Sequence, residues 1–483
     1  MTKCRIGIKA HTLSGAAALI IAVFLTLLFT GCPNAHGNKL ATPKYQVTFN
    51  VDGGGGTLTA KIGETEIKTD TTVEHGKTVT FTATPDKGYK VKGWTLDDNA
   101  VNGTAETYTL AVTQSATITV SFEPKKALLT LEAGKNTVKV KAKTADGSAI
   151  KVEGCTVTEL ANDTETTLTA KVAGTQIALI GELTELNCRG SEDASNRSLV
   201  ALDVSGCTAL QKLDCAKNQL TALNVQGLTA LQELSCGSNQ LKTLNVQGLT
   251  KLEKLYCQGN PLKALNVSGL TALQELQCND TNQLETLNVQ GCTTLKVLKC
   301  QYNKIAELDV SDLTALQELD CNTNQLKTLN VQGLTALQEL SCGSNQLKTL
   351  NVQGLTALQK LSCENNQLTT LNVQGLTALQ ELQCNDTNQL ETLNVQGCTA
   401  LKSLLCFKNK LNADAFIKIF NDLPIREASD NAEAILYAED EDLIEDNCTD
   451  FTQPEDLKKA FDGAKAKHWK LQKADGFGLG TDI

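Results

Sequence analysis

The sequence predicts a mostly β protein: a solenoid of short parallel strands, preceded by a small β domain and closed by a small α/β cap. Three observations support this. Residues 207–411 repeat with a period of 21 residues. Within each repeat, apolar and polar residues alternate over short runs, as a strand with one buried side requires. Only 4% of the 483 residues are aromatic, although 41% are hydrophobic. The core must therefore consist of small aliphatic side chains used many times.

The repeat divides into ten units, which start at residues 207, 228, 249, 270, 292, 313, 334, 355, 376 and 398. Their common frame is L-x-x-L-x-C-x-x-N-x-L-x-x-L-x-V-x-G, and the units at 270 and 376 carry one extra residue. A degenerate unit precedes them at 183–206, with a polar insertion at 189–197. This frame resembles the 21-residue class of bacterial leucine-rich repeats, also seen in treponemal surface lipoproteins. The resemblance implies a solenoid of about eleven coils over residues 183–411.

The pattern within one unit predicts how the coils stack. Leu234-Ser235-Cys236 alternates in–out–in, and Leu244-Asn245-Val246 does the same on the returning side before Gly248. Neither short strand can bury its apolar side alone. We therefore expect coils about 4.8 Å apart, with parallel strands on each flank.

Two residue types recur in single slots of the frame. The cysteine series is Cys188, Cys215, Cys236, Cys257, Cys278, Cys300, Cys321, Cys342, Cys363, Cys384 and Cys406. The asparagine series is Asn218, Asn239, Asn260, Asn303, Asn324, Asn345, Asn366 and Asn409. We expect the thiols to be buried small hydrophobes. Disulfides between neighbouring rungs are the alternative, but parallel side chains in one slot are poorly oriented for them. Ligands on a line do not converge on a metal, so we expect neither a metal nor another cofactor. We expect the amides to satisfy the backbone of turns.

The outside of the first strand and the loop after it vary between coils, and there we place the candidate ligand-binding residues. These are Lys254, Tyr256, Val297, Lys299 and Tyr302. Aromatic residues on a polar surface are typical of binding hot spots. Phe407 occupies a corresponding position, but we expect it to seal the final coil.

The array also looks like a doubled block of five coils. The units at 228 and 334 are identical, as are those at 270 and 376, each pair 106 residues apart. Surface residues that the two blocks share are then explained by copying and do not indicate a ligand-binding site. The informative positions are those where the copies differ, such as Tyr256 against Ser362, Lys299 against Leu405, and Tyr302 against Lys408.

The first 32 residues predict export. A basic start precedes the apolar run 16–29, which is too short to span a bilayer comfortably. Phe29-Thr30-Gly31-Cys32 resembles a relaxed bacterial lipobox. The resemblance implies a signal peptide at 1–31 and a lipid-modified Cys32; the alternative is a plain cleaved signal. Residues 32–44 are polar and predict a flexible tether.

Residues 45–125 predict a β domain. Strand-like runs include 45–51, 77–83, 89–95, 107–112 and 116–122, and Gly53–Gly56 predicts a hairpin turn. The run HGKTVTFTATPDKGYKVKGWTL, closed by ATITVSF, resembles the divergent internalin-type B-repeat family of bacterial surface proteins. That resemblance implies a β-grasp-like fold serving as a stalk or adhesive module. We expect Tyr89 and Trp94 in its core; a ligand platform is the alternative. Residues 126–182 continue with β-like alternation and predict a bridging unit that caps the array.

Residues 412–483 predict the C-terminal cap. Apolar spacing favours a helix over 413–423, and a strand-like run follows at 434–438. Thr452-Gln-Pro-Glu455 predicts a capping box before a second helix that reaches about Lys467. Aromatic residues reappear here, as expected where a compact cap covers the last coil.

Composition and order together favour a function. The net charge of −10 argues against a duplex nucleic-acid binder. We find no nucleophile–histidine pair or metal-ligand spacing, so we expect no enzyme and no small-molecule substrate. Anchor, stalk and repeat array in that order favour a lipid-anchored cell-surface protein of the cell envelope, expected at the outer membrane. We expect its array to bind a protein partner in adhesion to host or neighbouring cells. A structural spacer without a specific ligand is the alternative.

Overall fold

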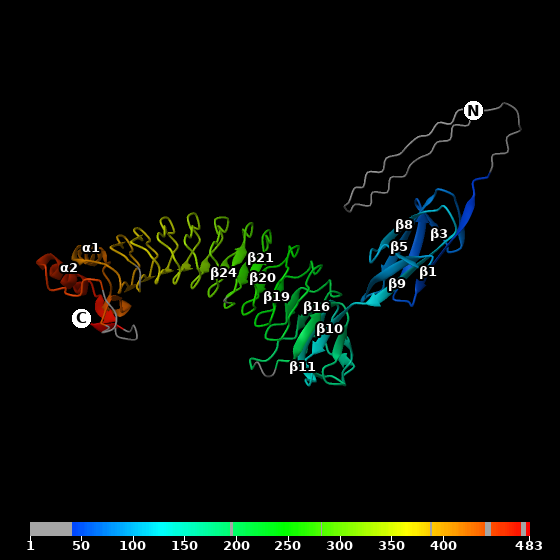
Figure 1. Ribbon diagram of the computed structural model, residues 1–483, viewed down its shortest axis with the longest axis horizontal. Coiled ribbons are helices and arrows are strands. Elements are labelled where there is room, and N and C mark those ends of the chain that lie inside the picture. The colour runs from blue at the N-terminus through cyan, green and yellow to red at the C-terminus, as the bar shows by residue number, and fades with distance from the viewer. Residues whose placement is uncertain (1–40, 194–196, 282, 387–388, 440–445, 475–479) are drawn as a thin grey trace, which may run out of the picture.

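The computed structural model describes residues 41–193, 197–281, 283–386, 389–439, 446–474 and 480–483. A small N-terminal domain is followed by a long, gently bowed row of coils, and two helices lie at the far end (Figure 1). The signal peptide expected at 1–31, the lipidation site Cys32 and most of the tether expected at 32–44 lie outside the described residues.

The N-terminal domain consists of two facing β-sheets. Its strands are β1 (Lys44–Asp52), β2 (Gly56–Ile62), β3 (Thr65–Ile67), β4 (Thr71–Glu74), β5 (Thr78–Pro85), β6 (Tyr89–Leu96), β7 (Asn99–Val101), β8 (Thr107–Ala111) and β9 (Ala116–Pro124). One sheet has the order β4-β1-β9-β6-β7 and the other β3-β2-β5-β8. The first and last strands, β1 and β9, pair in parallel. Phe81, Trp94 and Ile118 fill the space between the sheets.

The glycine run does not form the expected hairpin. It joins β1 to β2, and these strands belong to different sheets. A Cβ atom on Gly55 would lie 2.6 Å from the Tyr89 ring, and one on Gly56 would lie 2.6 Å from the Phe122 ring. The missing side chains therefore let the crossing segment pass beneath two rings. Tyr89 covers this crossing and stays 37% exposed, whereas Trp94 is buried.

Residues 126–182 supply antiparallel strands at the open end of the array. The strands are β10 (Lys126–Leu131), β11 (Thr137–Thr144), β12 (Ile150–Glu153), β13 (Glu159–Leu160), β14 (Thr166–Thr169) and β15 (Gln176–Ile180). β10 pairs with β17 (Leu199–Asp203), and β11 pairs with β16 (Leu183–Asn187), both antiparallel. The apolar side chains of this segment form one continuous core with those of the coils. Residues 126–182 thus cover the first coil, whose strands would otherwise end in an unpaired edge.

The coils form one long parallel sheet. After β16, its strands are β18 (Lys212–Asp214), β19 (Glu233–Ser235), β20 (Lys254–Tyr256), β22 (Glu275–Gln277), β24 (Val297–Lys299), β25 (Glu318–Asp320), β26 (Glu339–Ser341), β27 (Lys360–Ser362), β29 (Glu381–Gln383) and β31 (Ser403–Leu405). Successive strands pair in register, so that Leu213, Leu234 and Leu255 stack on one another. These leucines are buried and form the spine of the core. The leucine-rich-repeat solenoid is thus the architecture of this part of the chain.

The returning flank is less regular than expected. Among the described residues, strands of the ten units pair there at two places, β21 (Ala264–Asn266) with β23 (Thr286–Asn288) and β28 (Thr370–Asn372) with β30 (Thr392–Asn394), and a single bridge joins Asp203 to Asn224. In both pairs the second strand belongs to a unit with the extra residue. An Asx turn occurs at this place in units with and without a strand; the Asn351 side chain accepts from the Gln353 amide at 3.1 Å, and the Asn288 side chain of β23 accepts from the Gln290 amide at 3.1 Å. The expectation of strands on each flank is therefore wrong for most coils.

The C-terminal cap continues the long sheet. It contains α1 (Ala413–Asp422), the 3₁₀ turn η2 (Ala428–Asp430), β32 (Glu433–Ala438), α2 (Glu455–Ala466), β33 (Lys470–Ala474) and β34 (Gly480–Asp482). β32 pairs in parallel with β31, and β33 with β32. Phe416, Phe420, Phe451 and Phe461 pack ring against ring beneath the two helices. Neither helix is long and apolar enough to cross a membrane, as far as the described residues go.

The expected capping box at the start of α2 is wrong. The N-cap residue is Pro454, and no side chain caps the helix there. Thr452 instead donates its hydroxyl hydrogen bond to Asp450 at 2.6 Å, two residues upstream. This local Asx-type turn competes successfully with the helix cap.

Candidate partner-binding surface on the long sheet

The cysteine series lines the inside of the solenoid. All eleven side chains from Cys188 to Cys406 are fully buried and none forms a disulfide. Burial raises the pKa of the Cys257 thiol to about 12. No group of three metal-binding side chains occurs in the described ranges. The thiols are thus protonated packing groups, since the thiolate is the form that reacts or binds metal.

The asparagine series connects neighbouring coils through the backbone. Asn345 donates its side-chain amide hydrogens to the carbonyl groups of Cys321 at 3.0 Å and Cys342 at 3.1 Å, and its oxygen accepts from the Leu326 amide at 3.0 Å. The same three contacts recur at Asn218, Asn239, Asn260, Asn303, Asn324, Asn366 and Asn409. Each amide therefore satisfies buried groups of its own coil and the preceding one.

A further rung comes from the cap and was missed in the sequence. Asn447 donates to the Cys406 carbonyl at 2.9 Å, and its oxygen accepts from the Leu411 amide at 2.8 Å. Asn447 lies far outside the 21-residue period, so the sequence carries no signal for this role.

Because the interior side chains pack against one another, the outer surface of the long sheet is the candidate surface for binding a partner. We call Lys254, Tyr256, Val297, Lys299 and Tyr302 the tyrosine patch. It spans the three coils of β20, β22 and β24, where Tyr256, Gln277 and Lys299 are register neighbours. The predicted residues thus lie on one continuous surface.

A hydrogen bond fixes Tyr256 of the tyrosine patch, and an ion pair fixes Lys299. The Tyr256 hydroxyl donates to Glu275 at 2.8 Å, and Gln277 donates to the other oxygen of the same carboxylate at 2.8 Å. Burial and this carboxylate raise the pKa of Tyr256. Lys299 forms an ion pair with Glu318 at 2.9 Å, which raises the pKa of the lysine. The surface is therefore ordered before any partner arrives, which reduces the entropic cost of binding.

Tyr302 occupies a strained backbone position. Its φ of 56° belongs to a row in which almost every coil has a left-handed residue, such as Ser238, Ser344 and Asp386. Two coils before Tyr302, the same slot holds Gly259. A bulky aromatic residue is an outlier in this conformation, which costs roughly 1–2 kcal/mol. Its ring is 49% exposed, so packing does not offset the strain. Lys217, Thr323 and Lys408 have the same conformation, so the repeat imposes it, and Tyr302 differs from the row by carrying an exposed aromatic side chain.

Three amide oxygens border the tyrosine patch and were not predicted as site residues. Gln258, Asn279 and Gln301 occupy the position directly after the ladder cysteine in three successive coils. Their side-chain oxygens are buried and have no hydrogen-bond partner among the described residues. An unpaired buried acceptor costs about 1–3 kcal/mol, so each one requires an explanation. Copy divergence could have found two of them, since Glu364 and Phe407 replace Gln258 and Gln301 in the second block, whereas Asn279 is unchanged as Asn385.

Phe407 does not belong to this surface. It is only 6% exposed and packs with Ile435, Ala438 and Ala474 of the cap. Phe407 seals the final coil, as expected.

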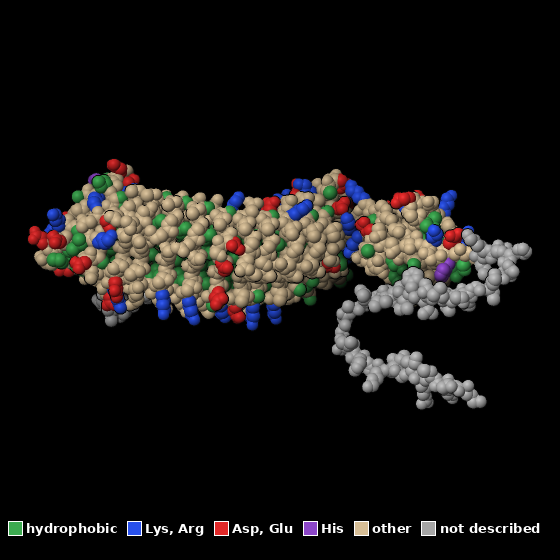
Figure 2. Space-filling view, turned by 90° about the horizontal axis from the view of Figure 1, so that it is seen from above, with side chains coloured by type: hydrophobic (Ala, Val, Ile, Leu, Met, Phe, Trp, Pro, Cys, Tyr) green, Lys and Arg blue, Asp and Glu red, His purple; other side chains and the backbone are tan. Residues whose placement is uncertain are grey.

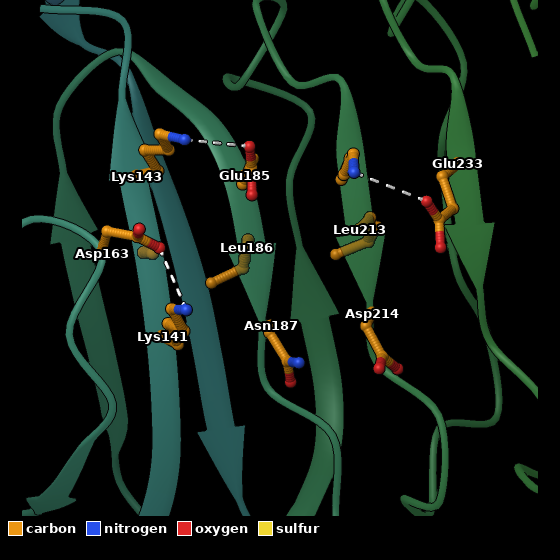
Figure 3. A pocket seen from close by; sticks show the side chains of 11 residues that line it. Lys141, Lys143, Asp163, Glu185, Leu186, Asn187, Leu213, Asp214 and Glu233 are labelled. Atoms are coloured by element: carbon orange, nitrogen blue, oxygen red, sulfur yellow. Dashed lines mark hydrogen bonds and ion pairs between the residues drawn. The ribbon is translucent and has the colours of Figure 1, made fainter. Parts of the chain in front are cut away.

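A hollow at the N-terminal end of the long sheet was not predicted (Figure 3). Its walls carry the ion pairs Lys141–Asp163 at 3.1 Å, Lys143–Glu185 at 3.4 Å and Lys212–Glu233 at 3.8 Å. Asp214, which also lines it, is 3.6 Å from Arg189. Every charge on the walls thus has an opposite charge nearby, and exposed pairs of this kind contribute about 0–1 kcal/mol each. Among the described residues, no buried polar atom without a hydrogen-bond partner lines the hollow, unlike the border of the tyrosine patch.

Residues 45–126 match the family model of the divergent InlB B-repeat domain. Several solved structures are similar to the chain. One is the functional domain of InlJ from Listeria monocytogenes, which includes a cysteine ladder; it is 25% identical, with a TM-score of 0.44 over 62% of this chain and 76% of that one. A leucine-rich-repeat protein of Leptospira interrogans is 27% identical, with a TM-score of 0.37 over 46% of this chain and 67% of that one. The leucine-rich effector YopM from Yersinia pestis is 21% identical, with a TM-score of 0.32 over 42% of this chain and 68% of that one. No curated protein matches the chain.

Proposed function

We propose that this chain is a bacterial cell-surface protein that binds a partner protein through the tyrosine patch of its leucine-rich-repeat array. The partner belongs to a host or neighbouring cell, and the interaction serves adhesion. The proposal includes a treponemal-type lipoprotein anchored to the outer membrane through Cys32, with the N-terminal B-repeat domain as a stalk.

The observation that carries the proposal is the combination of an exposed aromatic ring and unpaired buried acceptors at one place. Tyr302 holds an exposed ring at a left-handed backbone position. Gln258, Asn279 and Gln301 hold buried acceptors without partners among the described residues of the same three coils. A partner that packs on the Tyr302 ring would remove its exposed surface from water, and a shift of the amide side chains on binding would let the partner donate to these acceptors. Tyrosine rings are among the strongest contributors to protein interfaces.

Divergence between the two halves of the array supports the same place. Tyr256, Val297, Lys299 and Tyr302 all differ from the residues 106 positions later, whereas most of the sequence of the two blocks is shared. Residues that changed after duplication are those on which selection for a ligand can act separately.

The test is affinity capture with residues 33–483 as bait and surface-labelled partner cells as the source of protein. The double variant Tyr256→Ser, Tyr302→Lys introduces the residues of the second block, so the fold tolerates both changes. We expect loss of a protein that the unaltered bait captures. The matched control is Ser362→Ala, Lys408→Ala, which alters the corresponding positions of the second block and should leave capture unchanged.

Equal capture by the tyrosine variant and the control would contradict the proposed surface and favour the structural spacer. Protease treatment of intact cells tests the location separately. A protein displayed outside should lose its array, whereas a periplasmic one should be protected.

A further inference from the structure

A row of exposed lysines runs along one edge of the solenoid, and its middle member, Lys304, lies two residues after Tyr302 of the tyrosine patch. Figure 2 shows Lys and Arg side chains projecting side by side from one long edge of the array. The row comprises Lys242, Lys263, Lys304, Lys327 and Lys348, all exposed. Each follows the asparagine rung of its coil by one or three residues, where the chain leaves the long sheet. We call these five residues the lysine edge.

The amines of the lysine edge have no ion-pair partner in the described part of the chain, unlike several lysines of the long sheet. On the long sheet, Lys212, Lys299 and Lys360 form ion pairs with Glu233, Glu318 and Glu381. No carboxylate in the described part of the chain lies within 4.0 Å of a lysine-edge amine. The acidic residues on the same edge, Glu285 and Glu307, lie between the lysines without pairing with them. A local excess of positive charge thus persists on a chain with a net charge of −10.

Copying alone does not explain the row. The position of Lys263 holds Thr369 in the second block, and the position of Lys327 holds Thr221 in the first. Lys263 lies one coil from Lys242, and Lys327 lies one coil from Lys348. Each divergent site thus holds lysine where the adjacent coil also holds one. The two blocks have therefore diverged in a way that concentrates cations in the middle coils and leaves threonine at the outer ones.

The spacing indicates a linear ligand. Lysines of adjacent coils are about 5 Å apart, and the pair Lys242–Lys263 lies about 19 Å from the pair Lys327–Lys348. A small compact anion cannot reach both pairs, whereas a flexible chain with regularly placed anions can. The edge carries no aromatic residue on which nucleic-acid bases could stack. A continuous anionic membrane would meet Glu285 and Glu307, which a flexible chain can pass beside.

We propose that the lysine edge binds a linear anionic polysaccharide, sulfated or carboxylated, independently of the protein partner of the tyrosine patch. Such a site would hold the array along the glycan coat of a cell while the long sheet stays free.

The test measures binding of residues 33–483 to immobilised heparin at several salt concentrations. The variant Lys242→Thr, Lys263→Thr, Lys327→Thr, Lys348→Thr uses the residue that coils 207 and 355 already carry at this slot, so folding should be retained, as circular dichroism would check. We expect at least a tenfold loss of affinity and a shallower dependence on salt, because fewer counterions are released. The matched control, Lys61→Thr, Lys68→Thr, Lys77→Thr, Lys92→Thr, removes the same charge from exposed lysines of the N-terminal domain and should bind as before.

Three results would overturn the proposal. The edge variant could bind heparin as well as the unaltered chain, or both variants could lose affinity equally, which would reduce the effect to net charge. Binding to vesicles containing phosphatidylglycerol or to single-stranded DNA, with none to heparin, would assign the edge to another class of ligand. Capture of a protein partner at the tyrosine patch is measured separately, so either proposal can fail alone.

Discussion

At the scale of single residues, the array depends on the buried asparagine series, whose amides bond to the backbone of two neighbouring coils. At the end of the strand in each coil of the asparagine series, one asparagine side chain donates two hydrogen bonds and accepts one. The contacts of Asn345 with Cys321, Cys342 and Leu326 show this division of roles. Without the amide, two carbonyl groups and one N–H group would lose a partner in a place that water does not reach.

Asn345→Ala should therefore lower the free energy of unfolding by roughly 2–4 kcal/mol, because it leaves several buried backbone groups unpaired. The control is Asn351→Ala in the same coil, which removes an exposed Asx turn to Gln353 and should cost less than about 1 kcal/mol. Chemical denaturation of both variants measures the difference. Equal losses would show that the buried rung has no special role.

At the scale of elements, the cap closes the array by imitating a coil. β32 supplies the next parallel strand, and Asn447 supplies the next rung of the asparagine series. Lys467 also joins the two helices: its amine donates to the carbonyl groups of Phe420 at 2.9 Å, Asn421 at 2.8 Å and Leu423 at 2.9 Å, at the C-terminal end of α1. Since Pro424 ends that helix, these carbonyls have no further turn to bond with.

Lys467→Met keeps the length of the side chain but removes this cap. We expect a loss of about 1–3 kcal/mol, since charged hydrogen bonds to partly buried carbonyls are lost. Lys459→Met, on the exposed side of α2, should change stability by less than about 0.5 kcal/mol. Thermal unfolding compares the two variants. A similar melting temperature for both would contradict the capping role.

These elements also show what the sequence could and could not predict. The long sheet, α1 and β32 were predictable because period and alternation repeat the same physical requirement. The irregular returning flank was not predictable, because among the described residues strands of neighbouring units pair there only where one of the units carries an extra residue. The rung at Asn447 and the passage of Gly55 and Gly56 beneath rings depend on contacts distant in sequence, which no local pattern reveals. At the candidate site, the aromatic residues were visible in the sequence, whereas the unpaired state of the Gln258 and Gln301 oxygens required coordinates.

At the scale of the whole molecule, one interior serves every coil and the surface alone differs. Each coil adds a thiol, an amide and several leucines to a continuous core. Duplication of five coils could therefore lengthen the array without new packing, leaving the tyrosine patch and the lysine edge free to diverge. This arrangement also makes the stability of the array depend on the protonation of many thiols together.

Stability should fall steeply above about pH 9. Burial raises the pKa of the ladder thiols in the folded state, for Cys257 from 9.0 to about 12. Above pH 9, the unfolded chain therefore binds fewer protons than the folded one, and stability decreases with pH. Each such thiol contributes a slope of about 1.4 kcal/mol per pH unit. Below pH 9 this slope vanishes, because the thiol is protonated in both the folded and the unfolded chain. Urea midpoints between pH 7 and 10.5 measure the slope; a flat profile across this range would contradict protonated, buried thiols.

The most direct test of the stacked-coil interior is a count of reactive thiols. Residues 33–483 contain sixteen cysteines, of which fifteen are buried and only Cys448 is half-buried. With a chromogenic thiol reagent at pH 8, the native protein should show at most one fast-reacting thiol, and the denatured protein all sixteen, without prior reduction. Fast reaction of many thiols in the native state, or fewer than sixteen after denaturation without reductant, would contradict an interior of free, buried cysteines.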